Sequence, residues 1–309
     1  MNNNFFSIII PHLNEGYLLD ITLDSIYLRE KYDNFEIIIV DDGSPNYGDL
    51  EFLNNHFLSN KIKLFKKNGL GLAAAKNFGA SVASGSILFF LDSHMYFFKG
   101  VLDKLNEVFN TIPDISLAQP QIGNFKIKSC PGKIYKMNDL LLNTFWDEYK
   151  YERINGYFYN PNVAGGATVV KKSVFDDLGG FNPNTKKWGS EDVDFSMRAW
   201  LYGYKSYSID DLQIAHYFKQ KFENTTVEGG DILYNKIMFA LTCFQNPDRL
   251  NMILKNFEDK YSNNFIESYN KVLNNQEFKN WLKIQQSNFK NNDDRYFNLF
   301  KKYYPDFQI

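Results

Sequence analysis

The sequence is poor in residue types that mark several common protein classes. It has two cysteines among 309 residues, Cys130 and Cys243, which are too few for a disulfide framework and form no CxxC metal motif. We therefore expect a reducing compartment. The formal net charge is -2 and no long basic run is present, so the clustered Lys and Arg needed to neutralise phosphates are missing. Nucleic acid is not an expected partner.

Long apolar runs are also missing. The longest ones, such as residues 87–91, are far too short to cross a bilayer, and no transmembrane segment is expected. Residues 1–6 lack the basic and then apolar pattern of a signal peptide. We therefore expect a cytoplasmic protein. A peripheral contact with a membrane and assembly into a homo-oligomer stay open.

What the sequence does contain is a globular composition, with 44% hydrophobic residues, and a repeated strand-then-helix pattern. Three runs are apolar at nearly every position, which is typical of parallel strands buried on both faces: residues 6–11, 35–40 and 87–91. Two helical stripes lie between them, formed by Leu18, Ile21, Ser25 and Leu28, and by Leu72, Ala75, Ala80 and Ala83. This alternation predicts a doubly wound α/β sheet.

A further helix is expected at residues 190–202. Ser190 suits its N-cap, and the acidic Glu191 and Asp192 suit its first turn. Its apolar stripe consists of Val193, Met197, Trp200 and Leu201. From residue 221 onwards, helical patterns rich in Asn, Lys and aromatics dominate. We therefore divide the chain into an α/β domain, residues 1–220, and a helical C-terminal extension, residues 221–309.

Each of the three predicted strands ends in polar residues. In open α/β sheets, ligands bind in the crevice outside the carboxyl ends of the strands. The residues at these ends are His12, Asn14 and Glu15; Asp41 and Asp42; and Asp92, Ser93 and His94. Acidic groups that face one crevice repel each other, so this arrangement favours a cation or a cation-bearing ligand.

Asp92 and His94 are candidate metal ligands. On an extended segment, residues i and i+2 point to the same side, so a carboxylate and a neutral imidazole can share one divalent ion. Such a mixed oxygen and nitrogen set suits Mn²⁺ better than Ca²⁺. His216 is one of only four histidines and the natural third ligand. The alternative is a half-buried, hydrogen-bonded histidine.

Glu191 and Asp192 are candidates for a general base. The helix dipole favours the ionised form in a first turn, and an ionised carboxylate can deprotonate an acceptor. The alternative is that they only stabilise the helix end. Asp194 and Arg198, at i and i+4, are predicted to form a pair on the helix surface. The Gly69-Leu70-Gly71-Leu72 segment lacks the full GxGxxG pattern, so a dinucleotide oxidoreductase is not favoured.

Several motifs, taken in order, resemble the family 2 glycosyltransferases of GT-A fold, and above all the catalytic domain of the polypeptide N-acetylgalactosaminyltransferases. The motifs are Pro11-His12-Leu13-Asn14-Glu15, Val40-Asp41-Asp42-Gly43-Ser44, Lys76-Asn77, Leu91-Asp92-Ser93-His94, Ala164-Gly165-Gly166, Trp188-Gly189-Ser190-Glu191-Asp192 and His216. The resemblance covers residues 5–220. It implies a Rossmann-like nucleotide-sugar-binding domain that moves a sugar from a UDP-sugar to a peptide, a polysaccharide or a cell-wall polymer.

The resemblance also implies roles for single residues. Asp92, His94 and His216 would hold Mn²⁺, or Mg²⁺, on the diphosphate. Glu15 and Asp42 would contact the uridine. The other donor-binding residues would be Pro11, Asp41, Lys76, Ser93, Gly165 and Gly166, with Trp188 in a mobile loop over the site and Lys219 at the diphosphate.

Two departures from the peptide-modifying relatives bear on the mechanism. Ser190 stands where those relatives carry a second Gly, and Asp192 stands where they usually carry Asn. Glu-Asp at this position is the family 2 pattern in which the Asp is the base of an inverting displacement, whereas the peptide-modifying relatives retain configuration. We therefore expect inversion, with Asp192 as the general base and Glu191 beside it.

Three alternatives are kept. One is a retaining enzyme like the N-acetylgalactosaminyltransferases. Another is a nucleotidyltransferase, which the acidic His12-Leu13-Asn14-Glu15 segment disfavours because such enzymes carry a glycine-rich and basic loop there. The last is a sugar-nucleotide-binding module without catalysis, although Glu191 and Asp192 are both present.

Overall fold

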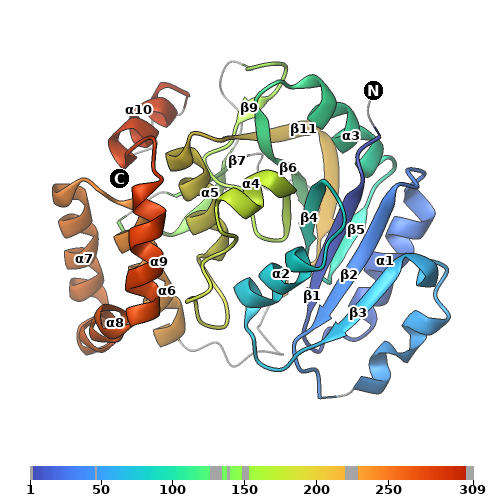
Figure 1. Cartoon of the computed structure of the whole chain (residues 1–309), viewed down its shortest axis with the longest axis horizontal. Coiled ribbons are helices and arrows are strands. Elements are labelled where there is room, and N and C mark those ends of the chain that lie inside the picture. Colours follow the sequence, from blue (N-terminus) through green and yellow to red (C-terminus); the bar gives the residue numbers. More distant parts are fainter. Residues whose placement is uncertain are drawn as a thin grey trace.

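The amino-terminal part of the chain forms the parallel strand–helix units that its apolar runs predict (Figure 1). A computed structural model describes residues 3–45, 47–125, 134–137, 140–147, 153–219 and 229–303. Strand β1 (Phe6–His12) lies between β2 (Phe35–Asp41) and β4 (Ile87–Leu91) and runs parallel to both. Strand β3 (Ile62–Lys66) extends the parallel sheet at its edge. The predicted strands are confirmed.

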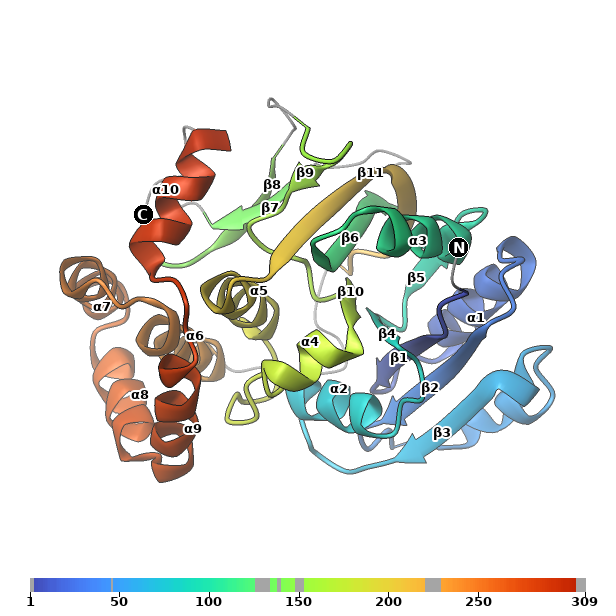
Figure 2. The same ribbon diagram turned by 45° about the horizontal axis from the view of Figure 1, so that its top comes forward.

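Side chains along these strands alternate between two cores, as expected for a sheet covered on both faces. Ile8, Ile10 and Phe89 pack in a core with helices α1 (Tyr17–Arg29) and α3 (Val101–Thr111). Ile9 and Phe90 pack on the opposite face, in a core with helices α2 (Leu72–Ser81), α4 (Lys172–Asp177) and α5 (Glu191–Tyr202). Figure 2 shows these helices on the two sides of the sheet. The doubly wound arrangement is therefore present.

The sheet is mixed beyond β4. Strand β10 (Ala167–Lys171) pairs antiparallel with β4 and with β6 (Ile115–Asn124), and β11 (Lys205–His216) then runs parallel to β6. Strand β5 (Met95–Phe97) closes this edge antiparallel to β11. The short β9 (Phe158–Tyr159) also pairs with β11, and β7 (Ile134–Met137) with β8 (Thr144–Asp147) forms a separate two-stranded sheet. The three apolar runs in the sequence did not predict these antiparallel strands.

Two predictions about helix faces hold only in part: Ser25 of the predicted α1 stripe is buried and Arg198 does pair with Asp194 at 2.8 Å, but the exposed faces differ. Helix α1 buries Leu19, Leu23 and Ile26, whereas Leu28 of the predicted stripe is 69% exposed. Apolar residues occur around most of this helix, so sequence spacing does not single out one face. Asp194 and Arg198 lie in the interior and not on the surface, because α5 is covered by the sheet on one side and by later helices on the other.

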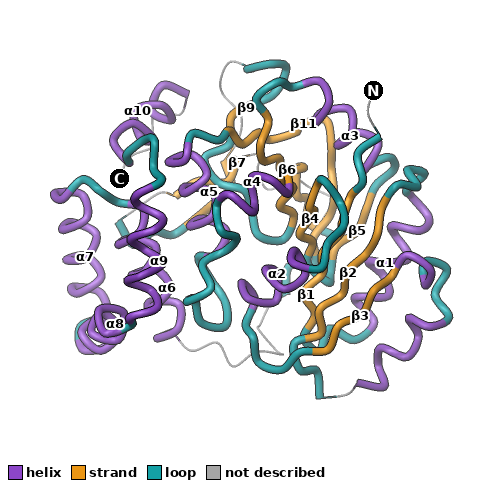
Figure 3. Tube along the Cα trace, in the orientation of Figure 1, coloured by secondary structure: helices purple, strands orange, loops and turns teal. Residues whose placement is uncertain are grey.

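The C-terminal region is helical, as predicted, and shares a core with the α/β part. Val193, Met197 and Trp200 of α5 pack in one cluster with Ile237 and Phe300. The helices are α6 (Gly229–Cys243), α7 (Pro247–Tyr261), α8 (Asn263–Asn274), α9 (Gln276–Ser287) and α10 (Asp293–Tyr303) (Figure 3). Two short 3-10 helices cover residues Tyr47–Asn54 and Ser59–Lys61.

The predicted boundary between residues 220 and 221 lies outside the described residues. Within the described ranges, no helix has both the length and the apolar character needed to cross a membrane.

Candidate active site

A cleft of about 1240 Å³ opens at the carboxyl ends of β1 and β4 and extends to α5 and α6. Of the residues predicted for the site, the following line it: Pro11, Glu15, Asp42, Lys76, Asp92, Ser93, His94, Gly165, Gly166, Trp188, Glu191, Asp192, His216 and Lys219. Asp41 is not among the residues that line the cleft. It is buried, and its Oδ1 accepts a hydrogen bond from the Ser44 hydroxyl. The motifs scattered over 200 residues of sequence are thus gathered at one place.

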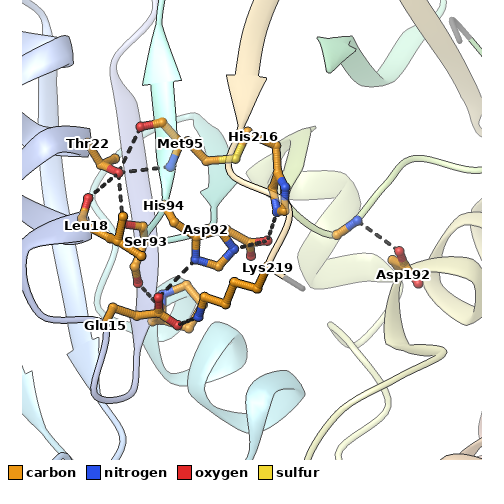
Figure 4. Close-up of polar contacts among 12 residues, drawn as sticks. Glu15, Leu18, Thr22, Asp92, Ser93, His94, Met95, Asp192, His216 and Lys219 are labelled. Atoms are coloured by element: carbon orange, nitrogen blue, oxygen red, sulfur yellow. Dashed lines mark hydrogen bonds and ion pairs between the residues drawn. The ribbon is translucent and has the colours of Figure 1, made fainter. Parts of the chain in front are cut away.

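Asp92, His94 and His216 form a compact cluster (Figure 4). Asp92 Oδ2 lies 3.3 Å from His216 Nε2 and 3.9 Å from His94 Nε2. The pairing of β5 with β11 places His216 opposite Met95, directly after His94. The antiparallel strand therefore brings the third candidate ligand to the first two.

Glu15 completes the surroundings of this cluster. Its Oε2 lies 3.2 Å from His94 Nδ1, and its Oε1 accepts a hydrogen bond of 2.5 Å from Lys219 Nζ. A carboxylate on one ring nitrogen orients a histidine and leaves the other nitrogen for a metal. Glu15 is therefore placed to orient His94, in addition to the nucleotide contact implied by the resemblance.

The electrostatics of the cluster suit a divalent cation. Burial alone would raise the pKa of Asp92, but its hydrogen bond with His216 and the charges of His94 and Lys76 hold that pKa well below its usual range. Burial lowers the pKa of His216, which favours the neutral imidazole that metals bind. Among the described residues, His216 Nδ1 is a buried nitrogen with no hydrogen-bond partner. One carboxylate and two imidazoles at these separations fit Mn²⁺.

Glu191 is buried at the wall of the cleft and paired with a lysine. Its Oε1 lies 3.2 Å from Lys76 Nζ, and its Oε2 accepts a hydrogen bond from the Gly189 N–H. Lys76 is fully buried and also donates to the Gly165 carbonyl. Lys76 therefore supports Glu191 and the Gly165 segment, a connection that the sequence did not suggest.

Asp192 is half-buried and lines the cleft. Its Oδ2 accepts a hydrogen bond from the Gly165 N–H and its Oδ1 one from the Val193 N–H, both 2.9 Å long. Neither oxygen carries a lysine or arginine partner in these contacts. Both carboxylates line the cleft but have different partners: Glu191 is paired with buried Lys76, whereas Asp192 accepts from two backbone N–H groups.

The expected effect of the helix dipole on Asp192 is opposed by burial and by a neighbouring charge. Burial and the neighbouring charge of Glu191 raise the pKa of Asp192 to about 7, against the opposing effect of its backbone hydrogen bonds and of Lys76. The helix dipole contributes only a modest stabilisation of the anion. A carboxylate with such a pKa is better matched to proton transfer than an ordinary one, since the best general base titrates near the working pH.

Neighbouring side chains come so close to residues 165 and 166 that glycine is required at both positions. A Cβ on Gly166 would lie 2.7 Å from Asp92 Oδ2, and one on Gly165 would lie 3.1 Å from both Glu191 Oε1 and Lys76 Nζ. These two glycines let the chain pass between the cluster of Asp92, His94 and His216 and the carboxylates of α5. The resemblance placed the same residues near the donor sugar.

Asp42 organises the loop before α2. Its two carboxylate oxygens accept hydrogen bonds from the Leu70 and Gly71 N–H groups at 2.6 and 2.8 Å. Each carboxylate oxygen can accept more than one hydrogen bond, so these contacts leave capacity for a ligand. The Gly69–Gly71 segment is therefore a loop held by Asp42 at the edge of the cleft.

The loop that carries Trp188 is held at both ends in this structure. The Lys187 carbonyl accepts a hydrogen bond from the Leu72 N–H, and Asn235 of α6 bonds to the backbone of the loop on its other side. Trp188 is 40% exposed at the cleft. Ser190 occupies the N-cap position, but its φ is 67° and its side chain makes no capping hydrogen bond. That backbone conformation favours glycine, which is what the relatives carry there.

Sequence reasoning missed four residues of the cleft or its supports: Tyr135 on β7, Trp146 on β8, and Asn235 and Lys236 on α6. Tyr135 and Trp146 lie outside the resembling motifs, and the two α6 residues sit in a mostly apolar helix. No local pattern marked them, because their role depends on contacts with distant segments.

Comparison with known proteins agrees with this geometry. The family model of glycosyl transferase family 2 matches residues 7–179. The chain belongs to this family. A second model, described as the N-terminal domain of galactosyltransferase, matches residues 150–223. The family 2 glycosyltransferase prediction is thereby confirmed.

The curated relatives include polypeptide N-acetylgalactosaminyltransferase 3 of Taeniopygia guttata, 29% identical over 250 residues that cover 74% of this chain and 40% of the relative. They also include the inactive polypeptide N-acetylgalactosaminyltransferase-like protein 5 of Macaca fascicularis, 27% identical, with 71% and 52% covered. The chain thus spans about half the length, or less, of these relatives. Because the relatives belong to the retaining group described above, they do not support the expected inversion.

A crystal structure of GalNAc-T7 with UDP, GalNAc and Mn²⁺ matches with a TM-score of 0.72 and 20% sequence identity. The match covers 86% of this chain and 55% of that chain. At this identity the likeness establishes the fold, and the GT-A prediction is confirmed.

Proposed function

We propose that this chain is a metal-dependent glycosyltransferase that moves a sugar from a UDP-sugar to an acceptor hydroxyl. The observation that carries the proposal is the joining, in one cleft of a family 2 chain, of the Asp92, His94 and His216 cluster with a carboxylate on α5. A nucleotidyltransferase is disfavoured because acidic Glu15 follows β1 in place of a basic loop. The chemistry needs a site for the diphosphate and a base for the acceptor, and the cleft offers candidates for both.

On the donor side, Asp92, His94 and His216 would hold Mn²⁺ or Mg²⁺, and Lys219 would reach the diphosphate. When bound, the cation offsets the negative charge that develops on the leaving nucleoside diphosphate. The ion pair of Lys219 with Glu15 would open or be shared as the phosphates arrive. Pro11, Asp42 and the Gly69–Gly71 loop would border the nucleoside.

On the acceptor side, Asp192 would take the proton of the attacking hydroxyl. Its position at the cleft and its pKa of about 7 support this role. The acceptor oxygen would then form a bond to the anomeric carbon as the bond to the diphosphate breaks. A general base that activates the acceptor is expected in an inverting reaction. We therefore propose inversion for this chain, whereas the relatives retain the configuration. NMR of the product from an α-linked donor decides the matter: a β linkage supports inversion, and an α linkage refutes it.

The defining experiment measures UDP release from a panel of UDP-sugars with and without a divalent cation. EDTA is expected to abolish UDP release, and added Mn²⁺ is expected to restore it. The His94→Ala substitution should also abolish UDP release. His56→Gln, at a histidine outside the cleft, serves as the control. Full activity in EDTA would refute the metal site, and absence of turnover with UDP binding intact would favour a binding module instead.

The uridine assignment has a separate test. Calorimetry in the presence of Mn²⁺ should show UDP binding at least tenfold more tightly than GDP or ADP, since losing a charge-assisted hydrogen bond costs about 1.5–3 kcal/mol. Equal binding of the three nucleotides would refute the assignment and leave the glycosyltransferase proposal standing.

A further inference from the structure

One half of the cleft has an aromatic wall that the proposed donor site does not use. Tyr135 of β7 and Trp146 of β8 line this half, with their ring centroids 4.9 Å apart and their planes tilted by 42°. The cleft volume of about 1240 Å³ exceeds the roughly 300–1,000 Å³ of a pocket for one small ligand. There is room for a second ligand beside a nucleotide-sugar.

This aromatic wall lies on the side of the candidate base. Burial, together with the nearby charge of Asp192, raises the pKa of the Tyr135 hydroxyl, so the two side chains are electrostatic neighbours. Figure 2 shows β7 and β8 beside α5, the helix that begins with Glu191 and Asp192. An acceptor that gives its proton to Asp192 would therefore lie against Tyr135 and Trp146.

Contacts from α6 and contacts between β7 and β8 hold the wall in place. Lys236 of α6 donates to the Leu141 carbonyl and to Asn143 Oδ1, both at 2.7 Å. Lys136 on β7 pairs with Asp147 on β8 at 2.7 Å. The Thr144 hydroxyl donates to the Tyr135 hydroxyl at 2.5 Å. A surface fixed in this way binds a ligand with a small loss of side-chain entropy.

Three lysines of the loop before α5 and of α6 already have partners within the chain. Lys187 Nζ lies 3.4 Å from Asp231, and Lys186 Nζ lies 3.9 Å from the same carboxylate. Lys236 is directed to a carbonyl and an amide oxygen of the wall. These three lysines all line the cleft and all have partners within the chain. A phosphate-bearing polymer would have to compete for cations that are already engaged.

We propose that this half of the cleft is an acceptor subsite for a neutral saccharide, which packs a pyranose ring on Tyr135 and Trp146 and directs one hydroxyl to Asp192. Aromatic rings suit the C–H face of a sugar, and Asn143 and Thr144 line the cleft as well. The inference rests on the proposed function. In the reaction, the acceptor oxygen bonds to the anomeric carbon, the nucleoside diphosphate leaves, and the acceptor proton passes to Asp192.

The test offers the full chain, with Mn²⁺ and a UDP-sugar that it turns over, three acceptor classes. These are methyl glycosides of glucose, galactose, mannose and N-acetylglucosamine, a peptide containing Ser and Thr, and a glycerol phosphate oligomer. Saturation-transfer NMR with UDP and Mn²⁺ present reports binding of the glycosides directly. We expect binding and transfer with at least one glycoside. Transfer to the peptide or to the phosphate oligomer alone, or no glycoside binding, would overturn the subsite assignment.

Variants locate the subsite. Trp146→Ala is expected to raise the KM for the glycoside tenfold or more while the affinity for UDP, measured by calorimetry, stays within twofold. Trp146→Phe should recover most of the loss. Tyr27→Ala removes an aromatic ring that stacks on Phe57 outside the cleft, and should change neither value. An unchanged acceptor KM in Trp146→Ala would overturn the inference, whereas failure of the wild-type chain to bind UDP would instead refute the proposed function.

Discussion

At the scale of single residues, the site is built from pairs of similar side chains in unlike surroundings. Glu191 and Asp192 are neighbours in sequence, yet Glu191 is paired with buried Lys76 and Asp192 faces the cleft. His94 is oriented by Glu15, whereas His216 contacts Asp92 directly. These differences come from which distant segment each side chain meets, and they give groups of the same kind different contacts.

Asp192→Asn is expected to reduce transfer by about 10²–10⁴-fold and to leave UDP affinity unchanged, because it removes a base without touching the nucleotide. In the wild type, only deprotonated Asp192 can act, so kcat/KM should rise as the pH passes upward through about 7. Steady-state kinetics over this range measure the effect. A flat profile, or an active Asp192→Asn variant, would contradict the base assignment.

The same carboxylate links pH to stability with a definite sign. The folded-state pKa of about 7 lies above the ordinary value of 3.8, so the folded protein binds the proton more tightly than the unfolded chain does. Stability should therefore fall as the pH rises between these two values. The Asp192→Asn variant, which lacks this titration, should lose less stability over the same range, as melting curves would show.

Gly166→Ala is expected to weaken Mn²⁺ binding by about 10–100-fold, the range seen when groups around a metal site are disturbed. The new Cβ would lie 2.7 Å from Asp92 Oδ2 and would push the carboxylate away from the two histidines. Calorimetry with Mn²⁺ and UDP measures the loss. Gly230→Ala is the matched control, because a Cβ there meets no atom within 4 Å among the described residues. Equal Mn²⁺ affinity in the two variants would contradict the prediction.

At the scale of elements, α6 connects the C-terminal helices to the site. Asn235, buried in this helix, accepts a hydrogen bond from the Lys186 N–H and donates to the carbonyls of Lys186, Trp188 and Gly189. One side chain thus satisfies four backbone groups of the loop that precedes α5. The helical extension therefore fixes the loop between the glycine segment and the carboxylates.

Asn235→Asp is expected to loosen this loop, since a carboxylate can accept from Lys186 but cannot donate to the three carbonyls. Each buried group left without a partner costs about 1–3 kcal/mol. Lys186 and Lys187 in the loop are partly exposed, so limited trypsin digestion should cut there faster than in the wild type. Asn274→Asp, at an exposed position on α8, should keep wild-type cleavage. Equal cleavage rates in both variants would show that Asn235 does not hold the loop.

At the scale of the whole molecule, the α/β part and the C-terminal helices share a hydrophobic core. Trp200 of α5 packs edge-on against Phe300 of α10, with 4.9 Å between the ring centroids, and Phe300 is fully buried. Buried Arg198 likewise contacts Gln285 of α9. Contacts of this kind couple the two parts, so we expect them to unfold together.

Phe300→Ala is expected to destabilise the entire chain by about 3–5 kcal/mol, the usual cost of removing a buried aromatic ring. Because the core is shared, calorimetry should show one transition shifted to lower temperature. Phe57→Ala, where the side chain is 72% exposed, should leave the melting temperature nearly unchanged. Two separate transitions, with only one of them shifted, would show that the helical extension is an independent unit.

Local patterns determined much of this protein. Continuous apolar runs identified β1, β2 and β4, and the polar residues behind them marked the cleft, because parallel strands place their carboxyl ends at one edge. The i, i+2 spacing of Asp92 and His94 indicated part of the cluster that His216 completes, and the ordered motifs indicated the family. Such features are readable because strand periodicity and strand ends depend on short segments of chain.

Only the tertiary structure decided the features that depend on distant contacts. The antiparallel pairing of β5 with β11 brings His216 to Asp92, across 124 positions of sequence. Burial between the sheet and the later helices places Asp194 and Arg198 in the interior and, with the charge of Glu191, raises the pKa of Asp192. Asn235, Tyr135 and Trp146 join the site through packing alone. Burial and long-range pairing are set by many weak contacts summed over the folded chain, and no short stretch of sequence contains that sum.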